Sequence, residues 1–227
     1  MIIELKKISK FYENLQTNTK LTVLNEITFS IDKGDSVAIV GPSGSGKSTL
    51  LNIIGTLDKP SSGIVKFNGN EINQLNDNQL SEIRNKNIGF VFQLHYLLPQ
   101  LNLIENVLLP AIPKNEKSRQ KETLERAMNL LETVGLADKI YQLPSQLSGG
   151  ESQRAAVVRA LINQPELILA DEPTGSLDAE SAQRIGELLS SINKNNKVAI
   201  IVVTHSEELA KKMNVIYKLR NGELVKF

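Results

Sequence analysis

The octapeptide Gly41-Pro-Ser-Gly-Ser-Gly-Lys-Ser48 constrains the fold of this chain more than any other segment does. It fits the pattern G-x-x-x-x-G-K-[ST], in which glycines let the backbone approach phosphate groups and the lysine reaches the β- and γ-phosphates. A short apolar run over 36–40 precedes the loop, and the apolar segment 48–54 after it is typical of a buried helix. The order of strand, glycine-rich loop and helix predicts a nucleoside-triphosphate site at a helix N-terminus.

Nine consecutive residues of this loop are expected to contact the phosphates: Gly41, Pro42, Ser43, Gly44, Ser45, Gly46, Lys47, Ser48 and Thr49. The Ser48 hydroxyl is also placed to hold Mg²⁺ beside the bound triphosphate. The alternative interpretation is a glycine-rich turn without a ligand, which the flanking strand and helix make a poor explanation.

Composition limits the classes of partner. Among the 227 residues, 26 basic side chains face 25 acidic ones, so the net charge of +1 does not favour electrostatic capture of nucleic acid. There are no cysteines, which excludes disulfides and thiolate metal sites.

The longest apolar run, Val198 to Val203, is far shorter than the roughly 18 residues that a membrane-spanning helix needs. The length suits one α/β core with an inserted subdomain, and we expect no membrane span.

Hydrophobic periodicity divides the chain into three parts. Strands are predicted over 2–5, 21–24, 27–31, 36–40 and 63–67, helices over 122–134 and 151–162, and a charged loop over 111–120. Strands over 167–170 and 198–203 flank a helix over 179–192, which is a βαβ pattern and implies a parallel sheet. We therefore predict an α/β core in two parts, 1–92 and 161–227, with a helical subdomain over 93–160.

A second candidate site follows the strand Leu167-Ile-Leu-Ala170, which ends in Asp171 and Glu172. Ligands of open parallel sheets bind beyond the carboxyl ends of the strands, so both acids are expected beside the phosphate loop. Asp171 is then expected to hold the Mg²⁺ shell, and Glu172 to accept a proton from the attacking water. An acidic helix cap ahead of Pro173 is the alternative.

A third candidate site is Leu147-Ser148-Gly149-Gly150-Glu151, which is followed by an apolar helix. Ser148 and Glu151 have the spacing of a capping box, so a well-capped helix start is one interpretation. A cap does not require two consecutive glycines, whereas an anion site at a helix N-terminus benefits from the exposed backbone N–H groups.

Together these motifs resemble the ATP-binding cassette (ABC) ATPases over essentially the whole chain. The resemblance implies a P-loop NTPase core of the RecA-like type with a parallel sheet, an N-terminal antiparallel β subdomain and an inserted α-helical subdomain. By the same resemblance Tyr12, with Phe11 as the alternative, is the aromatic that stacks on adenine. Gln93 is similar to the glutamine that senses Mg²⁺ and the attacking water, Ser176 and Asp178 to the D-loop at the dimer contact, and His205 to the histidine that contacts the γ-phosphate. The implied catalytic residues are Lys47, Gln93, Glu172 and His205, and the implied Mg²⁺ ligands are Ser48, Gln93 and Asp171.

The resemblance also implies partners. Two copies would pair head to tail around two ATP molecules, each held by one copy's P-loop and by Ser148, Gly149 and Gly150 of the other. The pair would drive a separately encoded membrane permease from the cytoplasmic face of a bacterial inner membrane, and the isolated chain would be soluble. The run after Gln93 is similar to the lipoprotein-releasing, macrolide-exporting and cell-division ATPases, most of all to the first. A nucleotide-gated clamp that acts on a membrane partner without transport, as in the cell-division branch, stays open as an alternative.

The segment after Gln93 is unusually apolar for a loop, with Leu94, Tyr96, Leu97 and Leu98 in five positions. An exposed apolar patch commonly marks an interaction site. The family resemblance implies that a cleft beside Gln93 receives a short helix of the permease. We predict that Tyr96 and Leu97 line this groove, and the alternative is that both belong to the core of the helical subdomain.

Overall fold

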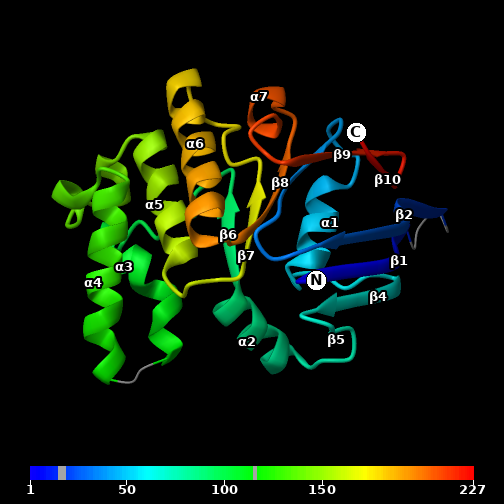
Figure 1. The fold of residues 1–227 in the computed structure, drawn as a ribbon, viewed down its shortest axis with the longest axis horizontal. Helices are drawn as coiled ribbons and strands as arrows, with labels where there is room; N and C mark the ends of the chain where they lie inside the picture. Colours follow the sequence, from blue (N-terminus) through cyan, green and yellow to red (C-terminus); the bar gives the residue numbers. More distant parts are fainter. Residues whose placement is uncertain (15–18, 115–116) are drawn as a thin grey trace.

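The computed structural model of this protein describes residues 1–14, 19–114 and 117–227 (Figure 1). Its first half contains β1 (Ile3–Asn14), β2 (Thr19–Ile31), β3 (Ser36–Val40), α1 (Lys47–Ile54), β4 (Ser62–Phe67), β5 (Asn70–Glu71), α2 (Asp77–Asn87), β6 (Ile88–Phe92), α3 (Leu103–Leu108) and the 3₁₀ helix η1 (Leu109–Lys114). The second half contains α4 (Lys117–Thr133), the 3₁₀ helices η2 (Ala137–Lys139) and η3 (Pro144–Gln146), α5 (Gly149–Leu161), β7 (Leu167–Asp171), α6 (Ala179–Asn196), β8 (Ala199–Thr204), α7 (Glu207–Ala210), β9 (Val215–Arg220) and β10 (Glu223–Lys226).

The centre of the molecule is a six-stranded sheet with the order β10-β9-β3-β8-β7-β6. The five strands from β9 to β6 run parallel to their neighbours, and β10 pairs antiparallel with β9. Along β8, Ile201 faces the core that contains α1, and Ile200 faces the core that contains α6. Helices therefore cover both faces of the sheet, which is why its strands read as continuous apolar runs.

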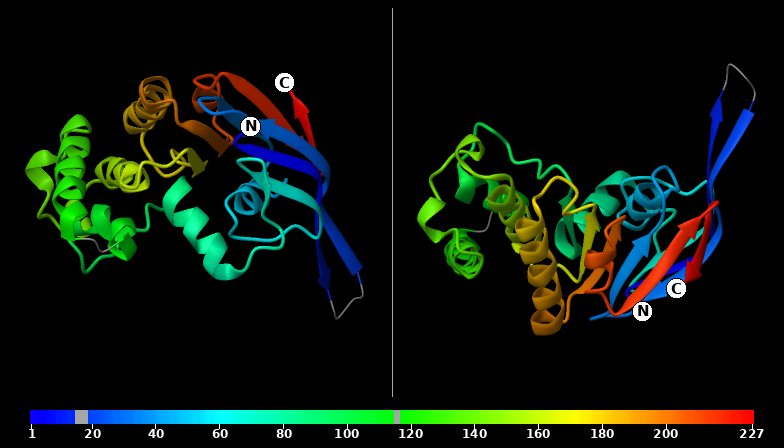
Figure 2. Two further views of the ribbon diagram at one scale, coloured as in Figure 1. Left: turned by 60° about the horizontal axis from the view of Figure 1, so that its bottom comes forward. Right: turned by 90° about the horizontal axis from the view of Figure 1, so that it is seen from above.

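A second, antiparallel sheet with the order β2-β1-β4-β5 lies against one side of this centre. The views in Figure 2 show its long β1–β2 hairpin projecting away from the rest of the molecule. Ile3, Leu5 and Leu24 of this sheet share one core cluster with Leu50 and Ile54 of α1, so α1 is enclosed between the two sheets. This packing fixes the start of α1 relative to the carboxyl edge of the central sheet.

The helical subdomain has its own core, to which Leu103 and Val107 of α3, Leu131 of α4 and Val158 of α5 contribute. Helix α5 also packs on the central sheet, because its Val157 belongs to the cluster of α6 and β8. Helix α5 therefore connects the helical subdomain to the α/β core. The α/β class, the parallel sheet, the N-terminal antiparallel sheet and the helical block agree with the predicted fold class.

Two expectations about local structure were wrong. The strands expected over 21–24 and 27–31 form a single strand, β2, whose pairing with β1 shifts register between Ile8↔Ile27 and Lys10↔Leu24, as at a β-bulge. The expected loop over 111–120 lies largely in helices, since η1 continues to 114 and α4 begins at 117, with 115–116 outside the described residues. Charged residues at the start of α4 are good helix formers, which the loop prediction underweighted.

Helix α2, strand β6 and the β9–β10 hairpin are further elements that were not predicted from the sequence. Asn76 caps α2 in a reciprocal capping box with Gln79, and this Asn-x-x-Gln spacing was a readable start signal. Asn221 and Gly222 join β9 to β10 with φ angles of 53° and 79°. Two such angles define a type I′ turn, for which Asn-Gly is the strongest sequence signal.

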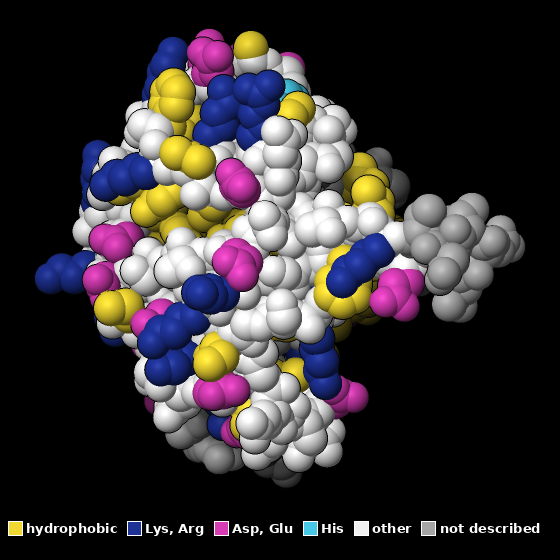
Figure 3. All heavy atoms as spheres, turned by 90° about the vertical axis from the view of Figure 1, so that its right-hand side faces the viewer, with side chains coloured by type: hydrophobic (Ala, Val, Ile, Leu, Met, Phe, Trp, Pro, Cys, Tyr) yellow, Lys and Arg dark blue, Asp and Glu magenta, His cyan; other side chains and the backbone are white. Residues whose placement is uncertain are grey.

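The face shown in Figure 3 carries basic and acidic side chains close to one another, with apolar side chains between them. Among the described residues, no helix is both long enough and apolar enough to cross a membrane.

Candidate functional site

The candidate site lies along the carboxyl edge of the central sheet. The P-loop follows β3, His205 follows β8, Asp171 ends β7, and Gln93 follows β6. These four strands are neighbours in the order β3-β8-β7-β6, so residues from four distant segments come to one edge. The arrangement is the one expected for a ligand bound beyond the strand ends of an open α/β sheet.

The P-loop is shaped to receive phosphates. Gly46 lies at the N-cap of α1 with a φ of 98°, a conformation that favours glycine, and it caps the helix without a side-chain hydrogen bond. The buried Lys47 ammonium donates to the backbone oxygens of Gly41 (2.9 Å) and Pro42 (3.0 Å), so it is held over the loop. The buried Ser45 hydroxyl finds no partner among the described residues. A phosphate oxygen would supply that acceptor.

Ser48 and Asp171 meet across the site. The Ser48 hydroxyl donates to Asp171 Oδ1 at 3.1 Å, although 123 residues separate them. Burial raises the pKa of Asp171, and the neighbouring Glu172 carboxylate adds to the rise, whereas Ser48 and Lys47 oppose it. Two adjacent hard oxygen donors suit Mg²⁺, whose charge would stabilise the ionised form of Asp171. The residues present therefore fit a magnesium–triphosphate complex.

Glu172 lies at the centre of the site. Its Oε1 is 4.0 Å from Lys47 Nζ, and its Oε2 is 3.0 Å from His205 Nδ1 and accepts from His205 N at 3.2 Å. The backbone of Glu172 has a φ of 45°, which is uncommon for a residue with a side chain. Its N–H donates to Val203 O at 2.9 Å and so ties this conformation to β8. The mostly buried Glu172 carboxylate thus lies between the Lys47 ammonium of the P-loop and the largely exposed His205 imidazole.

Gln93 and the D-loop are in contact. Ser176 Oγ donates to Gln93 O at 3.1 Å, and a Cβ atom added at Gly175 would lie 3.0 Å from Gln93 Nε2. Asp178 begins α6 as its N-cap and accepts from Ser181 N at 2.9 Å, which lowers the pKa of Asp178. Gly175 N donates to Glu172 O at 3.0 Å, so the D-loop lies between Gln93 and Glu172.

The signature segment Ser148–Gly150 starts α5, and Ser148 caps this helix. Gly150 approaches α6 so closely that an added Cβ atom would lie 2.6 Å from Ser181 Oγ. Helix α1 packs in the core on one side of the central sheet, whereas α5 and α6 pack in the core on the other side. The two helix N-termini expected to bind phosphate are thus on opposite faces of the sheet, as Figure 1 also shows.

Tyr12 lies on β1 with its side chain 48% exposed. Its hydroxyl donates to Asp58 Oδ2 at 3.3 Å, and Lys10 Nζ lies 5.1 Å from the centre of its ring and 2.7 Å from Asp58 Oδ1. Lys20 Nζ lies over the Phe11 ring instead. Tyr12 is thus about half exposed and is held at its hydroxyl, and its role as the adenine platform stays a prediction.

The prediction for Leu97 was wrong, and that for Tyr96 stays open. Leu97 is 7% exposed and belongs to the core of the helical subdomain with Leu103, whereas Tyr96 is 60% exposed. The alternation arises because Tyr96 adopts a left-handed φ of 48°, which turns the two side chains apart. Leu94 and Leu98 are exposed, as the expectation of an apolar patch required.

Three polar residues that the sequence analysis missed hold the segment after β6. Gln153 donates to Phe92 O (2.8 Å), and Arg159 donates to His95 O (2.6 Å) and Tyr96 O (2.7 Å). The fully buried Asn106 accepts from Leu98 N at 2.7 Å and donates to Leu98 O at 3.1 Å. Arg159 and Gln153 lie in the largely apolar helix α5, so the one sequence signal for a role was a polar side chain among apolar ones.

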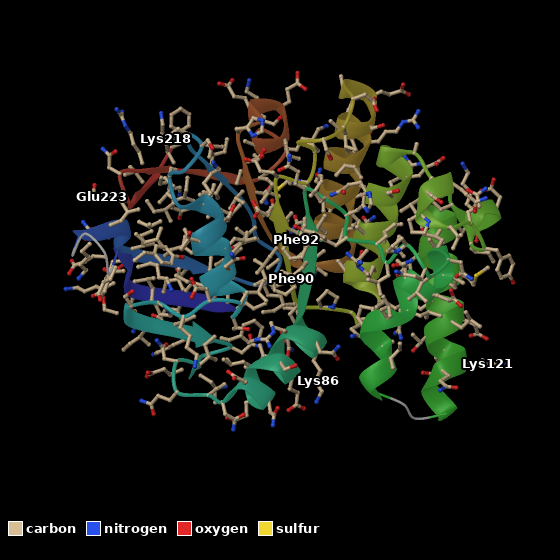
Figure 4. The ribbon with its side chains drawn as sticks, turned by 180° about the vertical axis from the view of Figure 1, so that it is seen from behind. Lys86, Phe90, Phe92, Lys121, Lys218 and Glu223 are labelled. Atoms are coloured by element: carbon tan, nitrogen blue, oxygen red, sulfur yellow. The ribbon has the colours of Figure 1, made fainter. Side chains whose placement is uncertain are left out.

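A groove of about 410 Å³ lies next to this segment, between α2 and β6 on one side and η1 and α5 on the other. Its lining includes Arg84, Phe90, Phe92 and Arg159. Figure 4 shows Phe90 and Phe92 next to each other on β6; their rings stack with centres 5.7 Å apart. Tyr96 does not line the groove itself, but its ring meets the lining residue Phe92 edge to face at 5.4 Å, so the exposed tyrosine lies beside the groove.

Known proteins are similar to this chain in sequence and in fold. The ABC transporter family matches residues 24–175. The lipoprotein-releasing system ATP-binding protein LolD of Legionella pneumophila (strain Paris) is 41% identical over 224 residues, which are 99% of this chain and 97% of that protein. LolD of Syntrophus aciditrophicus (strain SB) is 43% identical over 224 residues, which are 99% of this chain and 99% of that protein.

Two solved structures, a dimeric bacterial ABC transporter cassette and a dimeric ATP-binding cassette in a post-hydrolysis state with ADP and Pi, each superpose with a TM-score of 0.89. They are 42% and 41% identical to this chain, and in both cases 98% of this chain and 96% of the other is covered. On these matches, with the phosphate loop and acidic strand end in place, this chain belongs to the ABC transporter family as an ATP-binding and ATP-hydrolysing subunit.

Proposed function

We propose that this chain is the ATPase subunit of a transporter of the lipoprotein-releasing type. Two copies close head to tail around two Mg²⁺–ATP complexes and thereby drive a separately encoded membrane permease. The whole-length identity of 41–44% to LolD proteins supports the transporter type. The permease would hold the chain at the cytoplasmic face of a bacterial inner membrane.

The observation that carries the dimer is the position of the two phosphate-binding helix N-termini on opposite faces of one sheet. We infer that a γ-phosphate on the P-loop of one copy is bound by the start of α5 of another copy, and the dimeric solved cassettes support this inference. A second copy, turned head to tail, supplies its own Ser148, Gly149 and Gly150 instead, and the same operation completes the second site. Ser176 and Asp178 would then lie at the contact between the copies.

Within each site, we assign the residues by the contacts they make. Lys47 and the backbone N–H groups of the P-loop bind the phosphates, and Ser48 and Asp171, with Gln93, would hold Mg²⁺, which neutralises phosphate charge when bound. Glu172 accepts the proton of the attacking water, and His205, held by Glu172, contacts the γ-phosphate. The Tyr12 ring stacks on adenine.

The groove beside Tyr96 is the proposed permease contact. Its aromatic wall and flanking arginines suit a short amphipathic helix whose apolar face packs on Phe92 and Tyr96. Arg159 links the groove to the signature segment, because it lies on α5 and holds the backbone of Tyr96. Closure of the dimer moves α5, and the groove moves with it.

Mixing two inactive variants tests the shared site. Lys47→Ala damages the P-loop, and Ser148→Arg places a bulky cation at the start of α5, so each variant alone should hydrolyse ATP very slowly. In a one-to-one mixture, mixed dimers contain one intact site, and activity should recover to about a quarter of wild type for random pairing. Phosphate release measures this, and each variant mixed with wild type is the control. A mixture no more active than its components would contradict the head-to-tail arrangement.

Lys47 and His205 should differ in their roles: Lys47 should be needed to bind ATP, and His205 should be needed mainly to hydrolyse it. Lys47→Ala loses a charged hydrogen-bond donor to phosphate, so its ATP affinity should fall roughly 10- to 100-fold. His205→Ala should change ATP affinity less than about threefold but slow hydrolysis at least about tenfold, since the exposed imidazole acts on the γ-phosphate in the closed site. Calorimetry gives the affinities. Equal losses of affinity in both variants would contradict this division of roles.

Reconstitution separates transport from a nucleotide-gated clamp. The chain is incorporated into vesicles with a candidate permease identified by co-purification, together with a fluorescent lipidated protein. ATP-dependent release of the lipidated protein to a soluble acceptor supports transport. ATP hydrolysis that depends on the membrane protein but releases nothing favours the clamp.

A further inference from the structure

The signature segment carries a negative charge where the proposed function needs a positive end. Glu151 is the third residue of α5, directly after Gly149 and Gly150. In the proposed dimer this helix N-terminus faces the γ-phosphate on the partner's P-loop. A free carboxylate there would oppose the phosphate, because like charges in a water-poor interface repel one another strongly.

An ion pair and a hydrogen bond within the same chain neutralise the Glu151 carboxylate. Lys139, from η2, places its Nζ 2.5 Å from Glu151 Oε1, and the other oxygen, Oε2, accepts from Ser148 N at 2.8 Å. Both side chains are mostly covered, with 27% of Lys139 and 18% of Glu151 exposed. Lys139 and the Ser148 N–H lower the pKa of Glu151 to about 2, which means that both contacts stabilise the ionised carboxylate. Each of its oxygens has a partner within its own chain.

The same contacts orient Ser148. The Ser148 hydroxyl accepts from Glu151 N at 3.3 Å, and the Ser148 N–H is engaged by the carboxylate, so the capping box is closed from both sides. A hydroxyl that accepts this bond keeps its own hydrogen free to donate to a phosphate oxygen. If the Glu151 side chain swung away, the Ser148 N–H would lose its acceptor, and the capping box would be open on that side.

We propose that Lys139 is a positioning residue of the shared ATP site: it neutralises Glu151 and holds it in the cap, so that the start of α5 attracts the partner's γ-phosphate. This inference rests on the proposed head-to-tail dimer. Lys139 does not touch ATP and acts through Glu151. Its effect is therefore expected on dimer closure and not on ATP binding by the monomer.

The test measures ATP-dependent dimerisation in a Glu172→Gln background by analytical ultracentrifugation at saturating Mg²⁺–ATP. Lys139→Ala should raise the dimer dissociation constant about tenfold or more, because each dimer contains two exposed Glu151 charges. Lys139→Arg should restore dimerisation to within about threefold, since arginine can replace the ion pair. ATP affinity at low protein concentration should not change in either variant.

A double-mutant cycle gives the decisive comparison. In a Glu151→Gln background, which keeps the capping box without the charge, Lys139→Ala should change the dimer dissociation constant less than about twofold. The matched control is Lys86→Ala, which removes a lysine from the exposed Glu82–Lys86 pair on α2 and should have no effect, because neither residue contacts Ser148 or Glu151. Unfolding temperatures are recorded for every variant, and the double variant remains informative if Lys139→Ala folds poorly.

Three outcomes overturn the proposal: an unchanged dimer in Lys139→Ala, the same loss in both Glu151 backgrounds, or a loss that the control shares. Ser148→Arg in the same assay separates the two levels of inference. If Ser148→Arg abolishes dimerisation but Lys139→Ala does not weaken it, only the role of Lys139 fails. If Ser148→Arg leaves the dimer intact, the proposed shared site itself is wrong.

Discussion

Glu172→Gln is expected to lower steady-state ATP hydrolysis by a factor of at least about 100 while ATP binding persists. Glutamine keeps the shape of the side chain, and its amide oxygen can still accept from His205 N, but it cannot take up a proton from the attacking water. The phosphate contacts of Lys47 remain, because Lys47 is held by Gly41 O and Pro42 O. With ATP intact, the two copies should stay closed around it.

Two measurements check this prediction. Phosphate release gives turnover, and size-exclusion chromatography with ATP should show a dimer that wild type forms only transiently. The control is Glu180→Gln, which removes an exposed carboxylate paired with Arg184 on α6 and should leave turnover within about twofold of wild type. Undiminished turnover in Glu172→Gln would rule out Glu172 as the general base.

Leu97→Glu is expected to unfold or strongly destabilise the helical subdomain. Leu97 is 7% exposed and packs with Leu103 and other residues of that core, so the substitution buries a carboxylate without a partner. The expected loss in the free energy of unfolding is roughly 3 kcal/mol or more. Leu97→Met, which preserves volume, should cost less than about 1.5 kcal/mol. Thermal or denaturant unfolding measures both.

Tyr96→Glu should behave in the opposite way. Its side chain is 60% exposed, so the fold and the ATPase activity of the isolated chain should persist, while co-purification with the permease is lost. Tyr96→Phe should retain the permease, because the edge contact with the Phe92 ring does not need the hydroxyl. If Leu97→Glu folded normally, or Tyr96→Glu still bound the permease, the assignment of one residue to the core and the other to the groove would be incorrect.

The sequence by itself determined the features that depend on residues close together in the chain. The P-loop, the acidic end of β7 and the capped start of α5 each occupy fewer than ten residues. Their chemistry follows from the backbone that glycines, apolar runs and caps impose locally. The α/β class followed in the same way, because buried parallel strands and amphipathic helices leave distinct patterns.

Tertiary structure alone decided which distant segments meet and which side chains are covered. The strand order β3-β8-β7-β6 brings Gln93, Glu172 and His205 to one edge, and helices on opposite faces of the sheet separate the P-loop from the signature segment. Leu97 and Tyr96 are neighbours in one apolar run, and the tertiary packing of the helical subdomain buries Leu97 and leaves Tyr96 exposed. The ion pair between Lys139 and Glu151 also depends on tertiary structure, because it joins η2 to α5. The spacing of the two residues in the sequence does not predict how these elements pack.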